Sequence, residues 1–265
     1  MCNRRWIRAA LLAGSVLIGA VSEAYAASYQ THRGAIVDPI QDVRGGDSPY
    51  SGNNVERYAD LLGANLSFAE LPYADLAYAN LSNANLQNAN LYNALLAEAT
   101  LINADLSYAD LRSSALYRLN LTDADLQYAD LRFAILYELN LSNANLSHSN
   151  LNRVIMESAN LRYADLTAAN LAVADLTNSD LSGAMLFSTN LENSRFWESA
   201  TWTGAKYSLN AVDKNGNPIP DTIFPNGFDP FVAGMIPVPE PGTALLVGLG
   251  LIGLGMRRCV NQEAR

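Results

Sequence analysis

The residues best able to do chemistry in this chain are acids and amides that recur at a spacing of five. Each stands immediately before a leucine. Eleven of them are asparagines, and nine are aspartates, namely Asp60, Asp75, Asp105, Asp110, Asp125, Asp130, Asp165, Asp175 and Asp180. Aligned carboxylates could bind cations or imitate the charge of nucleic acid. Short Asp and Asn side chains also accept hydrogen bonds from nearby backbone amides at turns. The interspersed asparagines dilute the charge and favour this structural role.

Other reactive residues are scarce. The 265 residues include only two histidines, His32 and His148, and two cysteines, Cys2 and Cys259, which lie near the chain ends. The middle of the chain therefore lacks a thiol for a nucleophile, a disulfide or a thiolate zinc site. Residues 213–217 begin as a calcium loop does, but no acidic last ligand follows. We predict no catalytic residue, no cofactor and no metal site, and we expect that the chain is not an enzyme.

The period of five defines the element that must position these residues. A leucine stands at every fifth position from Leu61 to Leu191, with Met156 as the one replacement, and Phe196 closes the series. In a helix, successive leucines would lie about 140° apart, and in a straight strand alternate leucines would lie on opposite faces. The leucines gather only if the chain bends once in every repeat and each side of a coil directs its leucine inward.

A longer period gives the number of sides of the coil. Residues 94–113, 114–133 and 134–153 align as successive blocks of 20, in which Tyr108 recurs as Tyr128. A block of four pentapeptides predicts a four-sided coil. The tandem Ala-Asp/Asn-Leu-x-x motif resembles the pentapeptide-repeat family. This resemblance implies an all-β fold, a right-handed quadrilateral β-helix in which the leucine and the small residue two positions before it both point inward.

The repeats extend over residues 59–196. They predict a solenoid of about seven coils, roughly 34 Å tall at the spacing of about 4.8 Å between strands. Leu119, Leu139 and Val154 replace the small inward residue, and Thr189 and three serines also depart from the pattern. We expect local bulging at these positions and no break in the solenoid.

The first 26 residues predict a secretory signal peptide. They combine a basic start, an apolar run over residues 9–21 and a small-x-small site at Ala24 and Ala26. We expect cleavage after Ala26. The alternative is a retained membrane anchor, but the apolar run is shorter than the roughly 20 residues that a spanning helix needs.

Residues 238–265 resemble the PEP-CTERM sorting signal. The elements of the resemblance are Pro239, Glu240 and Pro241, an apolar run over residues 243–256, and then Arg257 and Arg258. The resemblance implies that exosortase recognises the segment after its apolar helix has transiently inserted into the inner membrane. It also implies cleavage near the proline motif and delivery to the cell surface or extracellular matrix of a Gram-negative bacterium that exports polysaccharide. The alternative is a plain C-terminal membrane anchor.

Two segments join the solenoid to these signals. Residues 27–58 are rich in turn-forming residues and predict an N-terminal cap or linker. Residues 197–237 predict a C-terminal cap and linker, in which Trp197, Trp202 and Tyr207 are bulky enough to close the open end of the core.

One outward column of the predicted coil is apolar. Where other repeats carry Asp or Asn, Leu95, Ala115, Ile135 and Ile155 stand in one column, and Tyr117 and Tyr137 flank it. We call these six residues the ridge and predict that it is exposed. Because contiguous exposed apolar surface marks contacts, the ridge is the candidate interaction site. The alternative is that the N-terminal segment covers it.

Two further outward columns have ordinary structural explanations. Glu98, Arg118 and Glu138 alternate in sign, and such an exposed ladder supports the register of the coils and contributes little stability. Tyr108, Tyr128 and His148 could stack against sugar rings, although aromatic ladders between adjacent strands are also common packing.

Three functions are compatible with the sequence. The leading hypothesis is an exported, non-enzymatic scaffold that presents its faces to partners. The second is a module that binds extracellular polysaccharide through the tyrosine columns. The third is imitation of DNA to inhibit topoisomerase, as cytoplasmic pentapeptide-repeat proteins do, but export would separate the chain from that target. The expected partners are exosortase and either exopolysaccharide or a second copy of the chain. The net charge of -9 argues against nucleic acid.

Overall fold

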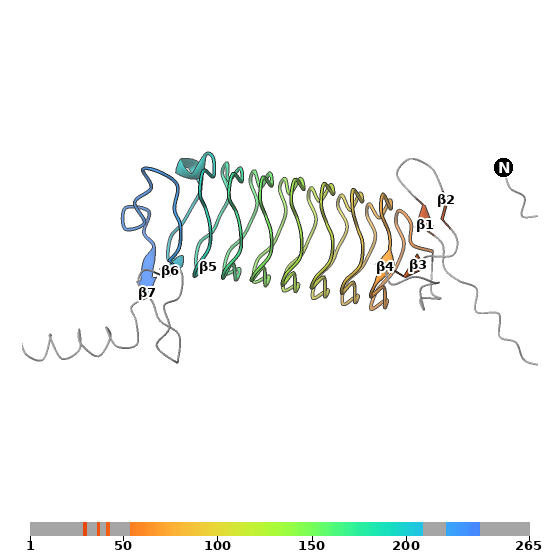
Figure 1. The fold of residues 1–265 in the computed structure, drawn as a ribbon. Coiled ribbons are helices and arrows are strands. Elements are labelled where there is room, and N and C mark those ends of the chain that lie inside the picture. Colours follow the sequence, from red (N-terminus) through yellow and green to blue (C-terminus); the bar gives the residue numbers. More distant parts are fainter. Residues whose placement is uncertain (1–28, 31–35, 38–40, 43–53, 209–220, 239–265) are drawn as a thin grey trace, which may run out of the picture.

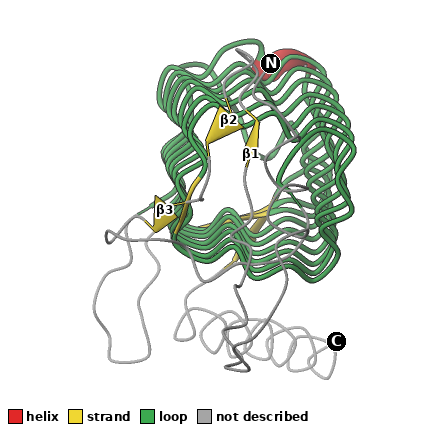
Figure 2. Cartoon of the chain, turned by 90° about the vertical axis from the view of Figure 1, so that its right-hand side faces the viewer, coloured by secondary structure: helices red, strands yellow, loops and turns green. Residues whose placement is uncertain are grey.

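The computed structural model of the chain describes residues 29–30, 36–37, 41–42, 54–208 and 221–238. The repeats form an elongated stack of coils (Figure 1), and the coils superpose into one closed outline when viewed along the stack (Figure 2). Most pairing between coils takes the form of single bridges, so the named elements are short. They are β1 (Tyr29–Gln30), β2 (Ile36–Val37), β3 (Gln41–Asp42), β4 (Ala69–Glu70), β5 (Met185–Leu186), the 3-10 helix η1 (Trp197–Ser199), β6 (Lys206–Ser208) and β7 (Ile236–Val238).

Parallel bridges define the four sides of the coil. Each bridge joins a residue to the one twenty positions later, and the first bridge on each side is Asp60 to Asn80, Asn65 to Asn85, Glu70 to Asn90, and Asp75 to Leu95. The fold is therefore a β-helix, and a coil takes four pentapeptides, as the 20-residue blocks predict.

The leucines and the small residues fill the interior. Along one side, Leu66, Leu86 and Leu106 stack with at most 1% of each side chain exposed. Burying a leucine in this way contributes about 1.5–3 kcal/mol. The backbone between the leucines is also paired, since the Leu86 amide donates to the carbonyl of Asp105 in the next coil at 2.6 Å. Packing and pairing therefore both fix the 20-residue register.

Each repeat bends at the two residues after its leucine. The amide of the small residue donates back to the leucine carbonyl, as Ala84 does to Leu81 at 3.0 Å, and the second turn residue takes a positive φ, which is 57° at Asn83. Asparagine tolerates this left-handed conformation well. Val173 adopts it too, with a φ of 62°, and a β-branched residue is strained there.

The departures from the small inward residue are accommodated within the stack. Leu119 and Leu139 are buried, but among the described repeats their two turns are the ones that lack the bond to the preceding leucine carbonyl. The larger side chain therefore widens these two turns, which is the expected local bulging. Val154 and Thr189 keep the bond, at 3.2 and 3.3 Å, so no such widening occurs there.

The buried serines take part in the turns. The hydroxyls of Ser114, Ser149 and Ser179 donate to the carbonyl of the leucine three residues earlier, at 2.6 to 2.9 Å. Their polar atoms are thereby satisfied inside the apolar core. The expectation of bulging at the three late serines, Ser149, Ser179 and Ser194, is wrong, because each keeps the backbone turn bond at 3.1 Å. The buried Ser194 hydroxyl differs from the others in that no partner is found for it among the described residues.

The end of the repeat differs from the expectation at Phe196. This residue stands in the leucine frame but is 55% exposed and has a φ of 55° where η1 begins. Thr201 pairs with Asp180, so one extra residue has entered the coil. The frame then resumes one position later, and Trp202 and Tyr207 occupy the inward positions, 4% and 0% exposed. These two residues close the core as expected.

Residues 197–237, expected as a cap and linker, also extend the stack. β5, β6 and β7 form a parallel sheet, in which Met185 pairs with Lys206 and Lys206 with Ile236. On another side, Ile223 pairs with Asn190. Coil-like pairing therefore continues well beyond Phe196, although the five-residue motif is no longer visible in the sequence.

The N-terminal end is finished by antiparallel strands. β3 pairs with β4 through Gln41 to Glu70 and Asp42 to Ala69, and β1 pairs with β2. β1 and β2 lie over the open end of the stack in both views (Figures 1 and 2). β3 thereby occupies the edge at Ala69 and Glu70, so that another chain cannot pair there.

Several expected features lie outside the described residues. These are the signal helix, the C-terminal sorting helix and the turn over residues 213–217. Within the described part of the chain, no helix has the length and apolar character needed to cross a bilayer.

The alternation of inward and outward positions gives a direct test. Leu126 is fully buried, whereas its neighbour Gln127 is partly exposed. We predict that Leu126→Ala lowers the free energy of unfolding by about 2–5 kcal/mol because it leaves a cavity between coils. The matched variant Gln127→Ala should change it by less than about 0.5 kcal/mol. Thermal and urea unfolding followed by circular dichroism measure both, and equal effects would contradict the frame.

Candidate functional site

The repeated Asp and Asn side chains are occupied by their own backbone. The Oδ1 atom of Asn120 accepts from the Thr122 amide at 3.1 Å, and that of Asp125 accepts from the Gln127 amide at 3.0 Å. Asparagines also bond along the column, as Asn160 does to Asn140 at 3.0 Å. No group of three or more His, Cys, Asp or Glu residues that could hold a metal ion occurs in the part of the chain that the structure describes. The geometry fits the structural role of these residues.

Arginine pairs reinforce one of these columns. Arg112 Nη2 lies 2.6 Å from Asp110 Oδ2, and Arg132 makes the same contact with Asp130 at 2.6 Å. Partial burial raises the pKa of the Asp110 carboxyl, but the hydrogen bonds from the side chain and the amide of Arg112 outweigh it. The pKa of Asp110 is consequently held below its usual value.

The acidic and basic ladder is present as expected. Arg118 Nε donates to Glu138 Oε2 at 2.7 Å, and Arg118 Nη1 lies 4.0 Å from Glu98 Oε1. The bond from Arg118 lowers the pKa of the Glu138 carboxyl. Exposed pairs of this kind contribute little stability, but each one joins adjacent coils in register.

The aromatic column forms a continuous stack. The ring centroids of Tyr108 and Tyr128 are 4.8 Å apart, and those of Tyr128 and His148 are 4.7 Å apart, with interplanar angles of 6° in both pairs. A sugar ring packs against an aromatic face, whereas both faces of Tyr128 are covered by its neighbours. Only the two outer faces of the stack are free of a ring contact, so this arrangement fits cross-strand packing better than a sugar platform.

The ridge lies on the outside of the stack as predicted. Bridges join Leu95, Ala115, Ile135 and Ile155 in sequence. Ile135 and Ile155 are 42% and 43% exposed, and Tyr117 is exposed as well. In the described part of the N-terminal segment, β3 pairs at Ala69 and Glu70 on a different side of the coil, and Arg57 contacts Asp75 at the N-terminal end of the ridge's column. The exposure of Ile135 and Ile155 shows that these residues are not covered.

The ridge interrupts the backbone bonding that Asp and Asn provide elsewhere. Asp75 and Asp175 stand in the same column on either side of it and accept from the Ala77 and Thr177 amides at 3.2 and 3.0 Å. An apolar residue cannot accept such a bond. Among the described residues, no acceptor is found for the equivalent amides, which are those of Ala97, Tyr117, Tyr137 and Glu157. The four apolar residues of the ridge column therefore leave out four hydrogen bonds that Asp or Asn side chains would accept from the backbone.

Two features around the ridge could not be read from the repeat. Phe133, from the neighbouring column, is exposed beside it, and the Arg153 guanidinium lies 5.8 Å from the centre of that ring. At its C-terminal end the ridge borders a hollow of about 350 Å³. The residues that line the hollow are Arg153, Val154, Ile155, Val173, Asp175 and Arg195. Basic groups thus gather at one end of an apolar surface.

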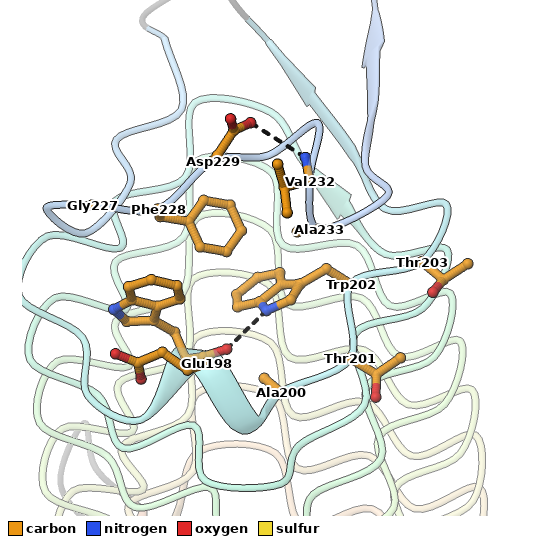
Figure 3. Close-up of a pocket in the computed structure, with 11 residues that line it drawn as sticks. Glu198, Ala200, Thr201, Trp202, Thr203, Gly227, Phe228, Asp229, Val232 and Ala233 are labelled. Atoms are coloured by element: carbon orange, nitrogen blue, oxygen red, sulfur yellow. Dashed lines mark hydrogen bonds between the residues drawn. The ribbon is translucent and has the colours of Figure 1, made fainter.

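A second cavity lies at the C-terminal end of the stack (Figure 3). It measures about 450 Å³, and we call it the aromatic pocket. Its rings are Trp197, Trp202 and Phe228, and Glu198 and Asp229 supply two carboxylates. Sequence reasoning assigned the tryptophans to core closure but missed the pocket. The residues of its other wall come from 227–233, whose position depends on the pairing of β6 with β7.

A four-sided parallel β-helix with a leucine core and Asp or Asn on its outer turns defines a pentapeptide-repeat solenoid. Residues 57–88, 79–116, 114–153 and 155–193 match pentapeptide repeats in eight copies. The chain therefore belongs to the pentapeptide-repeat family. Residues 237–258 match the PEP-CTERM protein-sorting motif, which implies processing by exosortase and export through the cell envelope. The predicted sorting residues, Pro239 to Pro241 and Arg257 to Arg258, fall within this match.

Several solved structures resemble the stack. QnrB1, a plasmid-mediated fluoroquinolone resistance protein, is 22% identical over 66% of this chain and 86% of its own, with a TM-score of 0.45. HetL of the cyanobacterium Nostoc, involved in regulating heterocyst differentiation, is 29% identical over 63% and 81%, with a TM-score of 0.24. No curated protein matches the chain. These likenesses concern the repeat architecture and say nothing about a shared partner.

The electrostatics of Asp110 give a pH-dependent prediction. Because its folded-state pKa lies below the unfolded value of about 3.9, its pair with Arg112 stabilises the fold above that value and the contribution is lost as the pH falls. Between about pH 6 and pH 3, Asp110→Asn should lose less in melting temperature than the unaltered chain. The difference should correspond to about 1 kcal/mol or less because the pair is partly exposed. Asp123→Asn, on another side of the coil, serves as the control, and identical pH profiles for all three proteins would contradict the assignment.

Proposed function

We propose that the protein is an exported, non-enzymatic scaffold that associates side by side with a second copy through the ridge. The observation that carries the proposal is the exposed apolar column that replaces Asp and Asn in four successive coils. Placing Ile135 and Ile155 outward forfeits backbone bonds that an asparagine would supply. A surface that is both exposed and less stable than its alternative is explained by a contact that buries it.

Rigidity supports the scaffold role. About seven coils, as the number of repeats predicts, are joined on all four sides by parallel bridges and by an unbroken leucine core. The outward polar groups are largely bonded to the solenoid itself, so they hold its shape and leave little chemistry for a substrate. A rod of this kind keeps its faces at fixed positions along its length.

Charges beside the ridge favour a second copy as the partner. Arg153 precedes Ile155 by two residues and Glu157 follows it by two, so the two side chains lie on opposite sides of the ridge. Glu138 lies on the same side as Glu157 but is already paired with Arg118, so Glu157 is the acid available to a second copy. If a two-fold axis runs parallel to the rods, the Arg153 side of one copy faces the Glu138 and Glu157 side of the other. Opposite charges then meet along both margins of the apolar contact.

The alternatives receive less support. Polysaccharide binding through Tyr108, Tyr128 and His148 would need open ring faces, and these rings cover one another. DNA imitation would need an undiluted acidic stripe, whereas asparagines alternate with the aspartates and the sorting motif implies export. The cell surface or the extracellular matrix is the location that we propose for the scaffold.

Processing at both ends is the first test. We predict that protein isolated from the native envelope has lost residues 1–26 and the segment that follows Pro239–Pro241. Intact-mass measurement gives both new ends directly. Mature surface material that retained Arg257 and Arg258 would overturn the sorting part of the proposal, and retention of the segment up to Ala26 would overturn the signal peptide.

The ridge is tested by restoring the residue that the other repeats use. In the double variant Ile135→Asn and Ile155→Asn, the new side chains can accept from the Tyr137 and Glu157 amides, so stability should stay the same or rise. Association between copies should weaken at least tenfold, because the change removes apolar area worth about 25 cal/mol per Å² at the contact. Sedimentation and thermal unfolding measure the two effects separately.

A control variant keeps this test specific. Thr100→Asn makes the same kind of change in the same position of a repeat on another side of the coil. It should leave association unchanged. A fall in melting temperature of the double variant would mean that the ridge is covered within one chain, and unchanged association would exclude the ridge as the contact.

A further inference from the structure

We propose that the aromatic pocket at the C-terminal end of the stack binds an organic ammonium group. The pocket combines three aromatic rings with two carboxylates, and no Lys, Arg or His is among the described residues that line it (Figure 3). A volume of about 450 Å³ suits a small ligand. This site is separate from the ridge, and neither depends on the other.

The rings are held by contacts with one another: Trp197 and Phe228 are partly exposed, Trp202 is nearly buried, and one face of Phe228 is stacked on Phe224 at a centroid distance of 4.9 Å. Trp197 and Trp202 both meet Phe228 edge-on, with centroid distances of 5.1 and 5.0 Å and interplanar angles of 78° and 68°. The indole nitrogen of Trp202 donates to the Trp197 carbonyl at 3.1 Å, which fixes the ring and consumes its donor. Differently oriented aromatic rings around one space are the arrangement that attracts an ammonium group through cation–π interactions.

The two carboxylates lie at opposite ends of the pocket (Figure 3). Glu198 is exposed at the rim. Asp229 is held in place because its Oδ1 atom accepts from the Phe231 and Val232 amides at 2.9 and 3.3 Å. Because the described part of the pocket wall holds no cationic side chain, the two acids favour a positively charged ligand.

Several backbone donors on the pocket wall are already used within the protein. The amides of Ala200 and Thr201 donate to Trp197 and Ser179 at 3.1 and 2.8 Å. On the opposite wall, the amides of Phe228 and Ala233 donate to Pro225 and Asp229 at 3.2 and 3.1 Å. The Thr201 and Thr203 hydroxyls also line the pocket and could donate. The two carboxylates therefore carry the preference for a cation over an anion.

Tryptophan fluorescence provides the readout. The chain has three tryptophans, Trp6, Trp197 and Trp202, so a Trp6→Phe background leaves only the two in the pocket. Full-length protein in this background is titrated with choline, and sodium chloride holds the ionic strength equal. We expect a saturable change, and we expect choline to bind at least about tenfold more tightly than its uncharged analogue 3,3-dimethylbutan-1-ol.

Matched variants locate the binding. Glu198→Gln removes one charge from an exposed position and should weaken choline binding about threefold or more. Glu192→Gln removes an exposed acid outside the pocket and should leave it unchanged. Phe228→Leu keeps an apolar side chain without the ring and should weaken binding further. If the Phe228→Leu variant fails to fold, the comparison of Glu198→Gln with Glu192→Gln still tests whether choline binds in the pocket.

Each remaining outcome is informative. Ethanolamine tested beside choline distinguishes a primary from a quaternary ammonium, and binding of either supports the proposal. The absence of a saturable signal with both would overturn it. Equal affinity for the uncharged alcohol would show an apolar pocket with no preference for charge, and tighter binding of glucose would show a neutral sugar site. Both results contradict an ammonium site.

Discussion

The bond from a leucine amide in one coil to a backbone carbonyl in the next is the constraint on which the rest of the structure depends. It can form only if each leucine points inward and the chain bends immediately after it. The bend requires a positive φ at the second turn residue, as at Asn83. The short Asp or Asn before each leucine then finds the amide two residues on within reach. One five-residue motif thus fills the core, forms the turn and provides hydrogen bonds for the outer backbone amides. Because each repeat supports its neighbours, these features reinforce one another along the stack.

Because the repeat alone is sufficient to specify the fold, positions that depart from its motif indicate a further constraint. Leu119 and Leu139 enlarge the inward residue and lose the turn bond, yet the bridges on either side keep their register. The ridge differs from these positions. Its apolar residues remove hydrogen bonds to outer backbone amides, and they add no packing to the core. The aromatic pocket exists because Phe196 turns outward and shifts the frame by one residue. Core, ridge and pocket respond to different constraints on the same scaffold.

Much of the fold could be predicted from the sequence because the period of five is physically restrictive. The inward leucines, the four sides of the coil and the outward ridge follow from spacing alone. The burial of the leucines confirms the first, the bridges confirm the second, and the exposure of Ile135 and Ile155 shows that the ridge is outward. The extra residue after Phe196 could not be foreseen, since a single insertion looks the same as the end of a repeat. The aromatic pocket escaped for a related reason. Phe228 and Asp229 follow no period, and their place is set by the long-range pairing of β7 with β6.

The bridges between residues twenty positions apart also determine how such a protein can change its length. Removing or duplicating one complete coil brings the same four sides back into pairing, and every outward column remains a column. Insertion or deletion of whole coils can therefore change the length of the rod in steps of about 4.8 Å. A partner that recognises a column would meet the same lateral arrangement in a longer or shorter relative, and only the number of rungs would differ. Duplication of a coil could thus lengthen a binding surface without the need to evolve a new one.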